Sequence, residues 1–276
     1  MARFERKNAG TSHSYTLDGQ KVPGVTTVNG ILDKPALVNW AAQQTAYYAD
    51  ENWEKLTGMR SGERISLLEK ARYNTNRKAV VKGNRIHNLG EQLANGVAVE
   101  VPLDIRSQVE AYAKFLDDWS IEAIATETPV CHTEWGFAGT FDLIGKSDRF
   151  GTALMDIKTG KGVYDEVALQ LNAYANCDLR LVSEEVTGPR GGKSTVWHEA
   201  PMVDIDCLLV AHVLEDTVEM VPVKLEPAIF ESFLHMLDIF ETWHKRTSWN
   251  YRDDPVHDSP IGKPLYPEDL ASPALV

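Results

Sequence analysis

The stretch GTFDLIGKSDRFGTALMDIKTGKGVYDEVALQLNAY, residues 139–174, decides the fold of this chain. Two short apolar runs, residues 140–145 and 153–158, flank a turn at 147–151 that is rich in Asp, Arg and Gly. Alternating apolar residues on both sides of such a turn predict a β-hairpin. The segment 166–177 that follows has the residue spacing of a helix. The stretch therefore predicts two strands and a helix in that order.

Three charged side chains of the hairpin are of the types that bind a metal ion and a phosphate group. Asp142 lies in the first expected strand, and Asp156 and Lys158 lie two residues apart in the second. Because side chains along a strand repeat with period two, Asp156 and Lys158 leave the same face. Two carboxylates on adjacent strands with an ammonium beside them form a site for a hard divalent cation and a phosphate group. In the helix, Gln170 and Tyr174 are four residues apart and share a face.

A further helix is expected upstream at residues 81–96, VKGNRIHNLGEQLANG, where apolar residues recur at helical spacing and a glycine ends the pattern. It places His87 and Glu91 one turn apart on one face. Taken alone, these features are weak. An isolated histidine on an amphipathic helix is more often a packing or surface residue. An Asp-x-Lys triplet also occurs by chance in a chain of ordinary composition.

The composition is that of an ordinary globular protein, with 276 residues, 43% hydrophobic and 25% charged. No run reaches the roughly 18 apolar residues of a membrane helix. The N-terminus has no apolar signal core. The three cysteines, Cys131, Cys177 and Cys207, contain no Cys-x-x-Cys pair, which disfavours a zinc site. We therefore expect a soluble protein with no membrane partner in a reducing cytoplasm, the host-cell cytoplasm if the source is a virus.

The charge is unevenly placed along the chain. The net charge of −12 argues against a surface that is basic throughout. Basic residues nevertheless gather before His87 and around the hairpin, and screening over about 8–10 Å makes such local charge decisive. They are Arg72, Arg77, Lys78, Lys82 and Arg85 on the first side, and Lys146, Arg149, Lys158 and Lys161 on the second.

The rest of the chain predicts an α/β fold with a central mixed β-sheet flanked by helices. Helices are expected at 36–56, 63–73, 104–119 and 226–244, strands at 121–131, 179–186, 194–199, 204–214 and 218–225, and a hairpin at 14–22 with its turn at Asp18-Gly19. Trp40 and Tyr48 are expected in the core or in domain packing. We expect a single domain at 1–249, with a helical N-terminal region at about 30–120 and a catalytic core at about 80–246, and a Pro-rich C-terminal tail at 250–276.

The order of these elements resembles the RecB-like branch of the PD-(D/E)XK nuclease superfamily. The matching residues are Gly83 and His87 in G-N-R-I-H, Asp142 in G-T-F-D-L-I-G, Asp156, Lys158 and Thr159 in D-I-K-T-G, and Gln170 and Tyr174 in Q-L-N-A-Y. The N-terminal stretch TLDGQKVPGVTTVNGIL, with LVNW after it, also resembles phage-encoded exonucleases of this type. The motifs span residues 83–174, and a looser likeness covers most of the chain.

The resemblance implies a restriction-endonuclease-like core and metal-dependent hydrolysis of DNA phosphodiesters. It favours an exonuclease in phage-type recombination or DNA processing. It also implies that His87, Asp142, Asp156 and the backbone carbonyl of Ile157 hold Mg²⁺ or Mn²⁺, as one ion or two. Oxygen-rich coordination suits Mg²⁺, and the imidazole suits Mn²⁺ as well. Lys158 would stabilise the transition state or hold the hydroxide.

Several roles stay open. Glu91 would reach a metal-bound water, or it is a solvated carboxylate on the helix face. Glu127, in the T-E-T-P-V strand pattern that the family also tends to carry, and Glu134 are expected at most to contact the ligands. The residues expected to contact DNA are Lys82, Arg85, Thr159, Lys161, Gln170 and Tyr174, of which the last two position the strand or brace the site.

One subgroup of these nucleases holds an iron–sulfur cluster with one cysteine upstream of the histidine motif and three near the C-terminus. This chain has no cysteine before Cys131 or after Cys207, so no cluster is expected. The expected partners are DNA, as duplex or single-stranded linear ends, and a recombination protein. The alternatives are a non-catalytic DNA-end or protein-binding module with the same fold, and an RNA-directed nuclease. The presence of every expected ligand and of the lysine disfavours the first.

Overall fold

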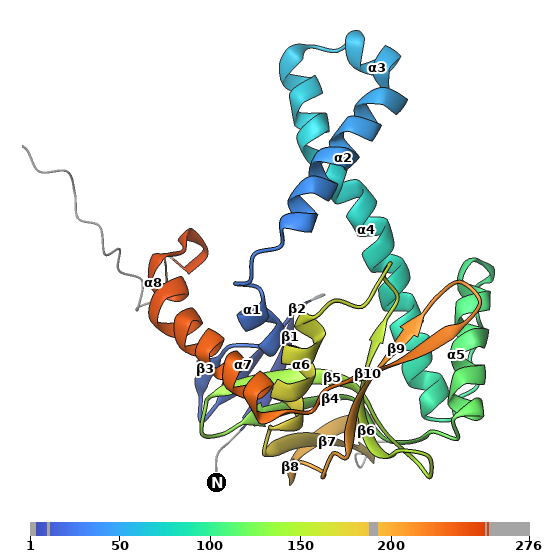
Figure 1. Ribbon diagram of the computed structural model, residues 1–276, viewed down its shortest axis with the longest axis vertical. Helices are drawn as coiled ribbons and strands as arrows, with labels where there is room; N and C mark the ends of the chain where they lie inside the picture. Colours follow the sequence, from blue (N-terminus) through green and yellow to red (C-terminus); the bar gives the residue numbers. More distant parts are fainter. Residues whose placement is uncertain (1–3, 10–11, 188–192, 252, 254–276) are drawn as a thin grey trace, which may run out of the picture. The chain divides into compact units, whose positions relative to one another are not determined.

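The computed structural model describes residues 4–9, 12–187, 193–251 and 253 (Figure 1). The chain divides into two compact units, Met1–Phe233 and Leu234–Val276. Apart from residues 250, 251 and 253, the Pro-rich tail expected at 250–276 lies outside the described residues. Among the helices of the described part, none combines the length and the apolar character that crossing a membrane requires.

The first unit is built on a seven-stranded mixed β-sheet of order β10-β9-β6-β5-β4-β7-β8 (Figure 1). Strands β6 and β9 run parallel, and the other neighbours pair antiparallel. The fold is therefore α/β with a mixed sheet flanked by helices, as expected. The strands are β4 (Glu122–His132), β5 (Phe137–Ser147), β6 (Gly151–Lys158), β7 (Leu179–Thr187), β8 (Lys193–Pro201), β9 (Cys207–Val213) and β10 (Val218–Val223).

The expected central hairpin is confirmed as β5 and β6. Its ladder runs from Ser147 opposite Gly151 to Leu143 opposite Met155. Gly151 has a φ of 78°, a conformation that glycine adopts without steric cost. The β5–β6 ladder ends at Leu143 and Met155, so Asp142 and Asp156 lie just beyond its last paired residues.

A small three-stranded sheet precedes the large one. It contains β1 (Phe4–Ala9), β2 (Ser12–Leu17) and β3 (Gln20–Val22), all antiparallel. The expected hairpin is confirmed: Asp18 and Gly19 have φ values of 52° and 78°, the two positive angles of a type I′ turn. Strand β1 was not expected from the sequence. The short helix α1 (Val25–Asn29) follows.

Helices cover both faces of the large sheet. Helices α4 (Ser61–Ala94) and α5 (Arg106–Asp118) share one hydrophobic cluster with Met155 and Ile157 of β6. Adjacent strand residues point to opposite faces. The opposite face carries Asp156, to which α6 (Glu166–Ala175) hydrogen-bonds. A short 3₁₀ turn, η1 (Leu103–Ile105), precedes α5.

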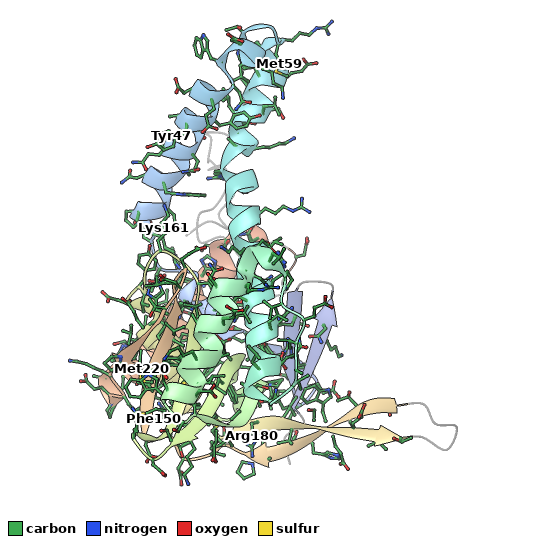
Figure 2. All side chains as sticks on the ribbon, turned by 90° about the vertical axis from the view of Figure 1, so that its right-hand side faces the viewer. Tyr47, Met59, Phe150, Lys161, Arg180 and Met220 are labelled. Atoms are coloured by element: carbon green, nitrogen blue, oxygen red, sulfur yellow. The ribbon has the colours of Figure 1, made fainter. Side chains whose placement is uncertain are left out.

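Three helical segments form what we call the helical arm: α2 (Pro35–Glu51), α3 (Trp53–Thr57) and residues 61–82 of α4. The arm projects beyond the sheet, with Tyr47 midway along it and Met59 at its far end (Figures 1 and 2). No residue of α2 is buried, so of the two places expected for Trp40 and Tyr48 the core is wrong, and packing between parts of the chain stays a prediction. The reason is that α2 packs along α4 and not on the sheet.

Helix α4 corrects a second expectation. The sequence predicted separate helices at 63–73 and 81–96, whereas one 34-residue helix spans both. The connecting residues include Asn-Thr-Asn, which have low helix propensity. Propagating an existing helix adds one hydrogen bond per residue, so flanking turns carry the helix through such a segment.

The predicted helix at 226–244 is confirmed as α7 (Pro227–Ile239) followed by a π-helical turn, η2 (Phe240–His244). Short segments α8 (Lys245–Thr247) and η3 (Trp249–Tyr251) complete the described chain. Within the second unit, the rings of Phe240 and His244 stack at 5.7 Å between centroids.

Candidate metal centre

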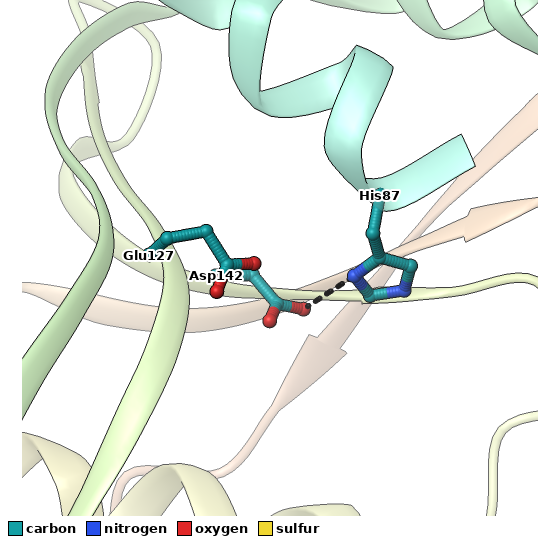
Figure 3. Close-up of side chains that lie close together, drawn as sticks. All are labelled: His87, Glu127 and Asp142. Atoms are coloured by element: carbon teal, nitrogen blue, oxygen red, sulfur yellow. Dashed lines mark ion pairs between the residues drawn. The ribbon is translucent and has the colours of Figure 1, made fainter. Parts of the chain in front are cut away.

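His87, Glu127 and Asp142 meet at one point of the first unit (Figure 3). They come from α4, β4 and β5, and one ligand atom of each lies within 4.8 Å of the other two. Nδ1 of His87 is 3.7 Å from Oδ2 of Asp142. The fold thus brings an imidazole and two carboxylates together from positions up to 55 residues apart in the sequence.

The register of β4 places Glu127. Thr126 pairs with Leu143 and Thr128 with Phe141, so Glu127 stands opposite Asp142. Its φ of 42° lies in the left-handed region, which a glutamate rarely adopts. Residues in such sparsely populated conformations cluster at functional sites, where the surrounding structure holds them. The strand therefore carries local strain at the residue whose carboxylate enters the cluster.

Asp142 is anchored from the neighbouring strand. The backbone N–H of Ile157 donates a hydrogen bond of 2.7 Å to Oδ2 of Asp142. Buried backbone donors need a partner, and this one lies beyond the last pair of the β5–β6 ladder. The carboxylate therefore serves the strand and the cluster at once, which fixes its position.

Asp156 is held by two side chains. Nζ of Lys158 forms an ion pair with its Oδ2 at 2.6 Å, and Nε2 of Gln170 donates to its Oδ1 at 3.0 Å. Burial is the main cause that raises the pKa of Asp156, and the neighbouring charge of Asp142 adds to it. The side chain of Lys158 is 38% exposed. It thus reaches from a buried carboxylate to solvent.

The structure brings together two of the three side chains that were expected as metal ligands, and their binding of a metal stays a prediction. His87 and Asp142 converge as predicted, whereas the third member of the cluster is Glu127 and not Asp156. Asp156 lies close enough to Asp142 to feel its charge. The backbone carbonyl of Ile157 stays a prediction.

Negative charge accumulates around Glu127. Burial above all, and then the carboxylates of Asp142, Glu91 and Asp156 against the opposing charge of Arg6, raise its pKa to about 7. Burial also raises the pKa of Glu91. Carboxylates crowded in this way favour a cation among them. Two carboxylates and one imidazole fit Mg²⁺ or Mn²⁺ in donor chemistry.

Two glycines allow close approaches around the site. A Cβ on Gly83 of α4 would lie 2.9 Å from Oγ1 of Thr159. A Cβ on Gly139 would lie 2.2 Å from the ring of Tyr174. Tyr174 is only 3% exposed. Because the ring packs inside the fold, the expectation that Tyr174 contacts DNA was wrong. The ring instead packs against Gly139 beside the site.

His212 supports the segment that follows Lys158, a role that the sequence did not indicate. It lies opposite Lys158 in the parallel β6–β9 ladder. Its Nε2 is 2.9 Å from the carbonyl oxygen of Gly160, and its Nδ1 is 3.3 Å from Oε2 of Glu219. With the imidazole buried between two acceptors, it ties the loop after β6 to the sheet.

The basic residues expected to contact DNA differ in their surroundings. Arg85 donates two hydrogen bonds, of 2.6 and 2.9 Å, to Asp104, and this contact raises its pKa. An exposed ion pair of this kind leaves the guanidinium within reach of a phosphate, so the expected DNA contact of Arg85 stays a prediction. Nζ of Lys82 lies 4.0 Å from Glu215. Lys161 is exposed at the base of the arm (Figure 2).

No protein-family model and no curated protein matches this chain. The interpretation of the site therefore depends on its own geometry. Sequence reasoning undervalued Glu127, although the T-E-T-P-V strand was a signal for it. Glu134, named with it, lies exposed in the turn between β4 and β5 and is not in the cluster.

Proposed function

We propose that this protein is a metal-dependent nuclease that hydrolyses DNA phosphodiesters, with the core of the PD-(D/E)XK superfamily. One observation carries the proposal: His87 of a helix meets Glu127 and Asp142 of two adjacent strands, beside the Asp156–Lys158 pair of a third. A plain surface cluster of acids would not include an ammonium next to a buried carboxylate.

His87, Glu127 and Asp142 would hold Mg²⁺ or Mn²⁺, with Asp156 as a further carboxylate close by. Such an ion, when bound, polarises a phosphoryl oxygen and lowers the pKa of a water molecule. The hydrogen bond from Ile157 holds the carboxylate of Asp142, and the surrounding structure keeps the backbone of Glu127 in its sparsely populated conformation. Preorganised donors of this kind cost little reorganisation during a reaction.

Side chains of the protein would bind the scissile phosphate and accept the proton of the attacking water. The half-exposed ammonium of Lys158 binds a non-bridging oxygen of the scissile phosphate, while Asp156 and Gln170 fix its direction. Removal of one such charge-stabilising donor typically costs 10²–10³ in rate. The pKa of Glu91 is raised toward neutral pH, and a carboxylate with a pKa shifted in this direction is a better acceptor for a proton from the attacking water.

The resemblance of the motifs adds the finer parts of the proposal. They are an exonuclease rather than an endonuclease, linear DNA ends as substrate, and phage-type recombination or DNA processing in the cytoplasm as the setting. The basic residues of α4 before His87 support a polyanionic substrate on a chain whose net charge is −12.

End-labelled linear duplexes and internally labelled circular duplexes test the proposal, each incubated with Mg²⁺, Mn²⁺ or EDTA. We expect metal-dependent digestion of the linear form. Asp142→Asn should abolish it and weaken Mn²⁺ binding in titration calorimetry. The control Asp104→Asn changes an exposed aspartate that pairs with Arg85 and should keep both properties.

Three results would contradict the proposal. The first is wild-type protein that cuts no DNA with either metal. The second is an Asp142→Asn variant that binds Mn²⁺ as the wild type does. The third is preferential cleavage of RNA, which would favour an RNA-directed nuclease. DNA binding without cleavage would favour a non-catalytic module.

A further inference from the structure

Helix α4 concentrates positive charge before the metal centre. Residues 60–85 contain eight Lys or Arg and two Glu, a net charge of +6. The whole chain carries −12, which leaves −18 for the rest. A local field of this sign attracts a polyanion to one element of an otherwise acidic protein.

The same helix joins the arm to the site without a break. Gly83 and His87 define the face of α4 that is turned toward the site, because one approaches Thr159 and the other Asp142. Helical spacing places Val80 and Tyr73, seven and 14 residues before His87, on this face. At 1.5 Å per residue, Tyr73 lies about 21 Å from His87 along the axis.

The residues of this face stay open to solvent. Ile65 is 52% exposed, Tyr73 57% and Val80 50%. Tyr73 and Val80, with the adjacent Arg72, form what we call the arm stripe. Large apolar side chains that remain exposed along one line toward a site indicate an interaction surface.

Arg72 and Tyr73 form a pair suited to a nucleotide. The guanidinium of Arg72 lies 4.6 Å from the ring centroid of Tyr73, and its Nη2 donates to the tyrosine oxygen at 2.6 Å. Within the described residues, no carboxylate lies at ion-pair distance from Arg72, in contrast to Arg85 with Asp104. An aromatic face and an arginine with no acidic partner provide stacking for a base and a charge for its phosphate.

We propose that the arm stripe binds a single strand of DNA and leads its end to the metal centre, an inference that rests on the proposed nuclease function. Exposed aromatic and aliphatic side chains favour a single strand over a duplex, whose bases are already stacked on one another. A path of about 21 Å accommodates about six nucleotides at about 3.4 Å each. This length falls within the range of about 4–16 nucleotides known for single-strand sites.

Fluorescence anisotropy of the full chain with labelled oligothymidylates of 3, 6 and 12 nucleotides, in EDTA, tests the stripe apart from cleavage. Affinity should rise up to about six nucleotides and change little beyond. Tyr73→Ala should weaken binding of the longer oligonucleotides about ten-fold, and Tyr73→Phe should retain it because the ring stays. Arg72→Ala should reduce the salt slope of binding by about 0.7.

Lys55→Ala is the matched control, because it removes the same charge from α3 at the end of the arm. It should leave affinity and salt slope unchanged. The same oligonucleotides joined to a duplex, with Mn²⁺ present, then report cleavage. There, Tyr73→Ala should raise the Michaelis constant and leave the turnover number close to that of the wild type.

The outcomes separate the stripe from the nuclease. If wild-type protein cuts duplex DNA but Arg72→Ala and Tyr73→Ala bind single strands as it does, the stripe is wrong and the nuclease stands. If Tyr73 governs binding but nothing is cut with either metal, the stripe stands and the nuclease fails. The arm stripe could instead bind a second copy of this chain. Sedimentation would then show a dimer, and Tyr73→Ala would dissociate this dimer without loss of DNA affinity. That result would overturn the proposal.

Discussion

Replacing Glu127 by Gln should stabilise the metal-free protein, by an amount that grows with pH. The pKa of this carboxyl is about 7 in the folded protein and 4.5 without its surroundings. Between these two pH values the folded state binds the extra proton, so the free energy of unfolding falls as pH rises. Glutamine has the same shape and does not titrate, so the variant lacks this part of the decline.

The magnitude follows from the same two values. A difference of one pKa unit is worth about 1.4 kcal/mol, so Glu127 costs up to about 3 kcal/mol above pH 7. Part of the side chain reaches solvent, which makes this figure an upper value. Below pH 4.5 the carboxyl is protonated in both states, and the two proteins should have nearly the same stability. Asp156 titrates in the same direction in both proteins, and because its charge interacts with that of Glu127, the difference reports Glu127 together with this coupling.

Urea denaturation in EDTA at pH 5, 6, 7 and 8 measures the effect. The two free energies of unfolding should lie close at pH 5 and diverge toward pH 8, with the variant higher. Adding Mn²⁺ at about 100 times its Kd should stabilise the wild type by about 2.7 kcal/mol and the variant by less. Glu134→Gln, an exposed glutamate of the β4–β5 turn, is the control. Parallel pH profiles for Glu127→Gln and wild type would refute the reasoning.

Three further substitutions test the surroundings of the site. Lys158→Met should raise the pKa of Asp156 further and reduce cleavage about 100-fold or more, measured as the turnover number; a loss of only a few-fold would remove Lys158 from the reaction. Gly139→Ala should destabilise the protein by about 1–3 kcal/mol in urea, because its Cβ meets the buried ring of Tyr174; an unchanged midpoint would mean that the ring moves aside freely. His212→Ala should cost about 1–3 kcal/mol and speed amide exchange in the loop after β6, and unaltered exchange there would contradict its bridging role.

Local sequence patterns were sufficient to predict the helices and strands whose formation depends on neighbouring residues in the sequence. The β5–β6 hairpin follows from alternation and a Gly-containing turn, and α6 follows from its helical spacing. The pattern failed for α4, because low propensity at 74–76 suggested an end that the cooperativity of a long helix overrides. It also failed for Trp40 and Tyr48, because spacing predicts which face of a helix is apolar and not whether a sheet covers it.

The candidate site shows the same division. His87 and Asp142 could be named in advance because helix, strand and turn signals surround them. The entry of Glu127 into the cluster depends on the register of β4 against β5 and on a backbone φ of 42°, and neither is a local property of T-E-T-P-V. The engagement of Arg85 by Asp104 depends on how α4 meets the chain just before α5, a contact across 19 residues. Which acidic side chain joins the cluster, and which basic side chain forms an ion pair, therefore depends on tertiary contacts that local sequence patterns do not predict.

The uninterrupted α4 helix extends much farther on the N-terminal side of Gly83 than the distance from Gly83 to His87. Its N-terminal end lies about 33 Å along the axis from Gly83, where the helix touches Thr159, while His87 lies only about 6 Å away on the other side. A tilt of about 5° around that contact would swing the far end by roughly 3 Å and shift the histidine by roughly 0.5 Å. Any such tilt would therefore displace the far end of the arm about six times as far as the imidazole.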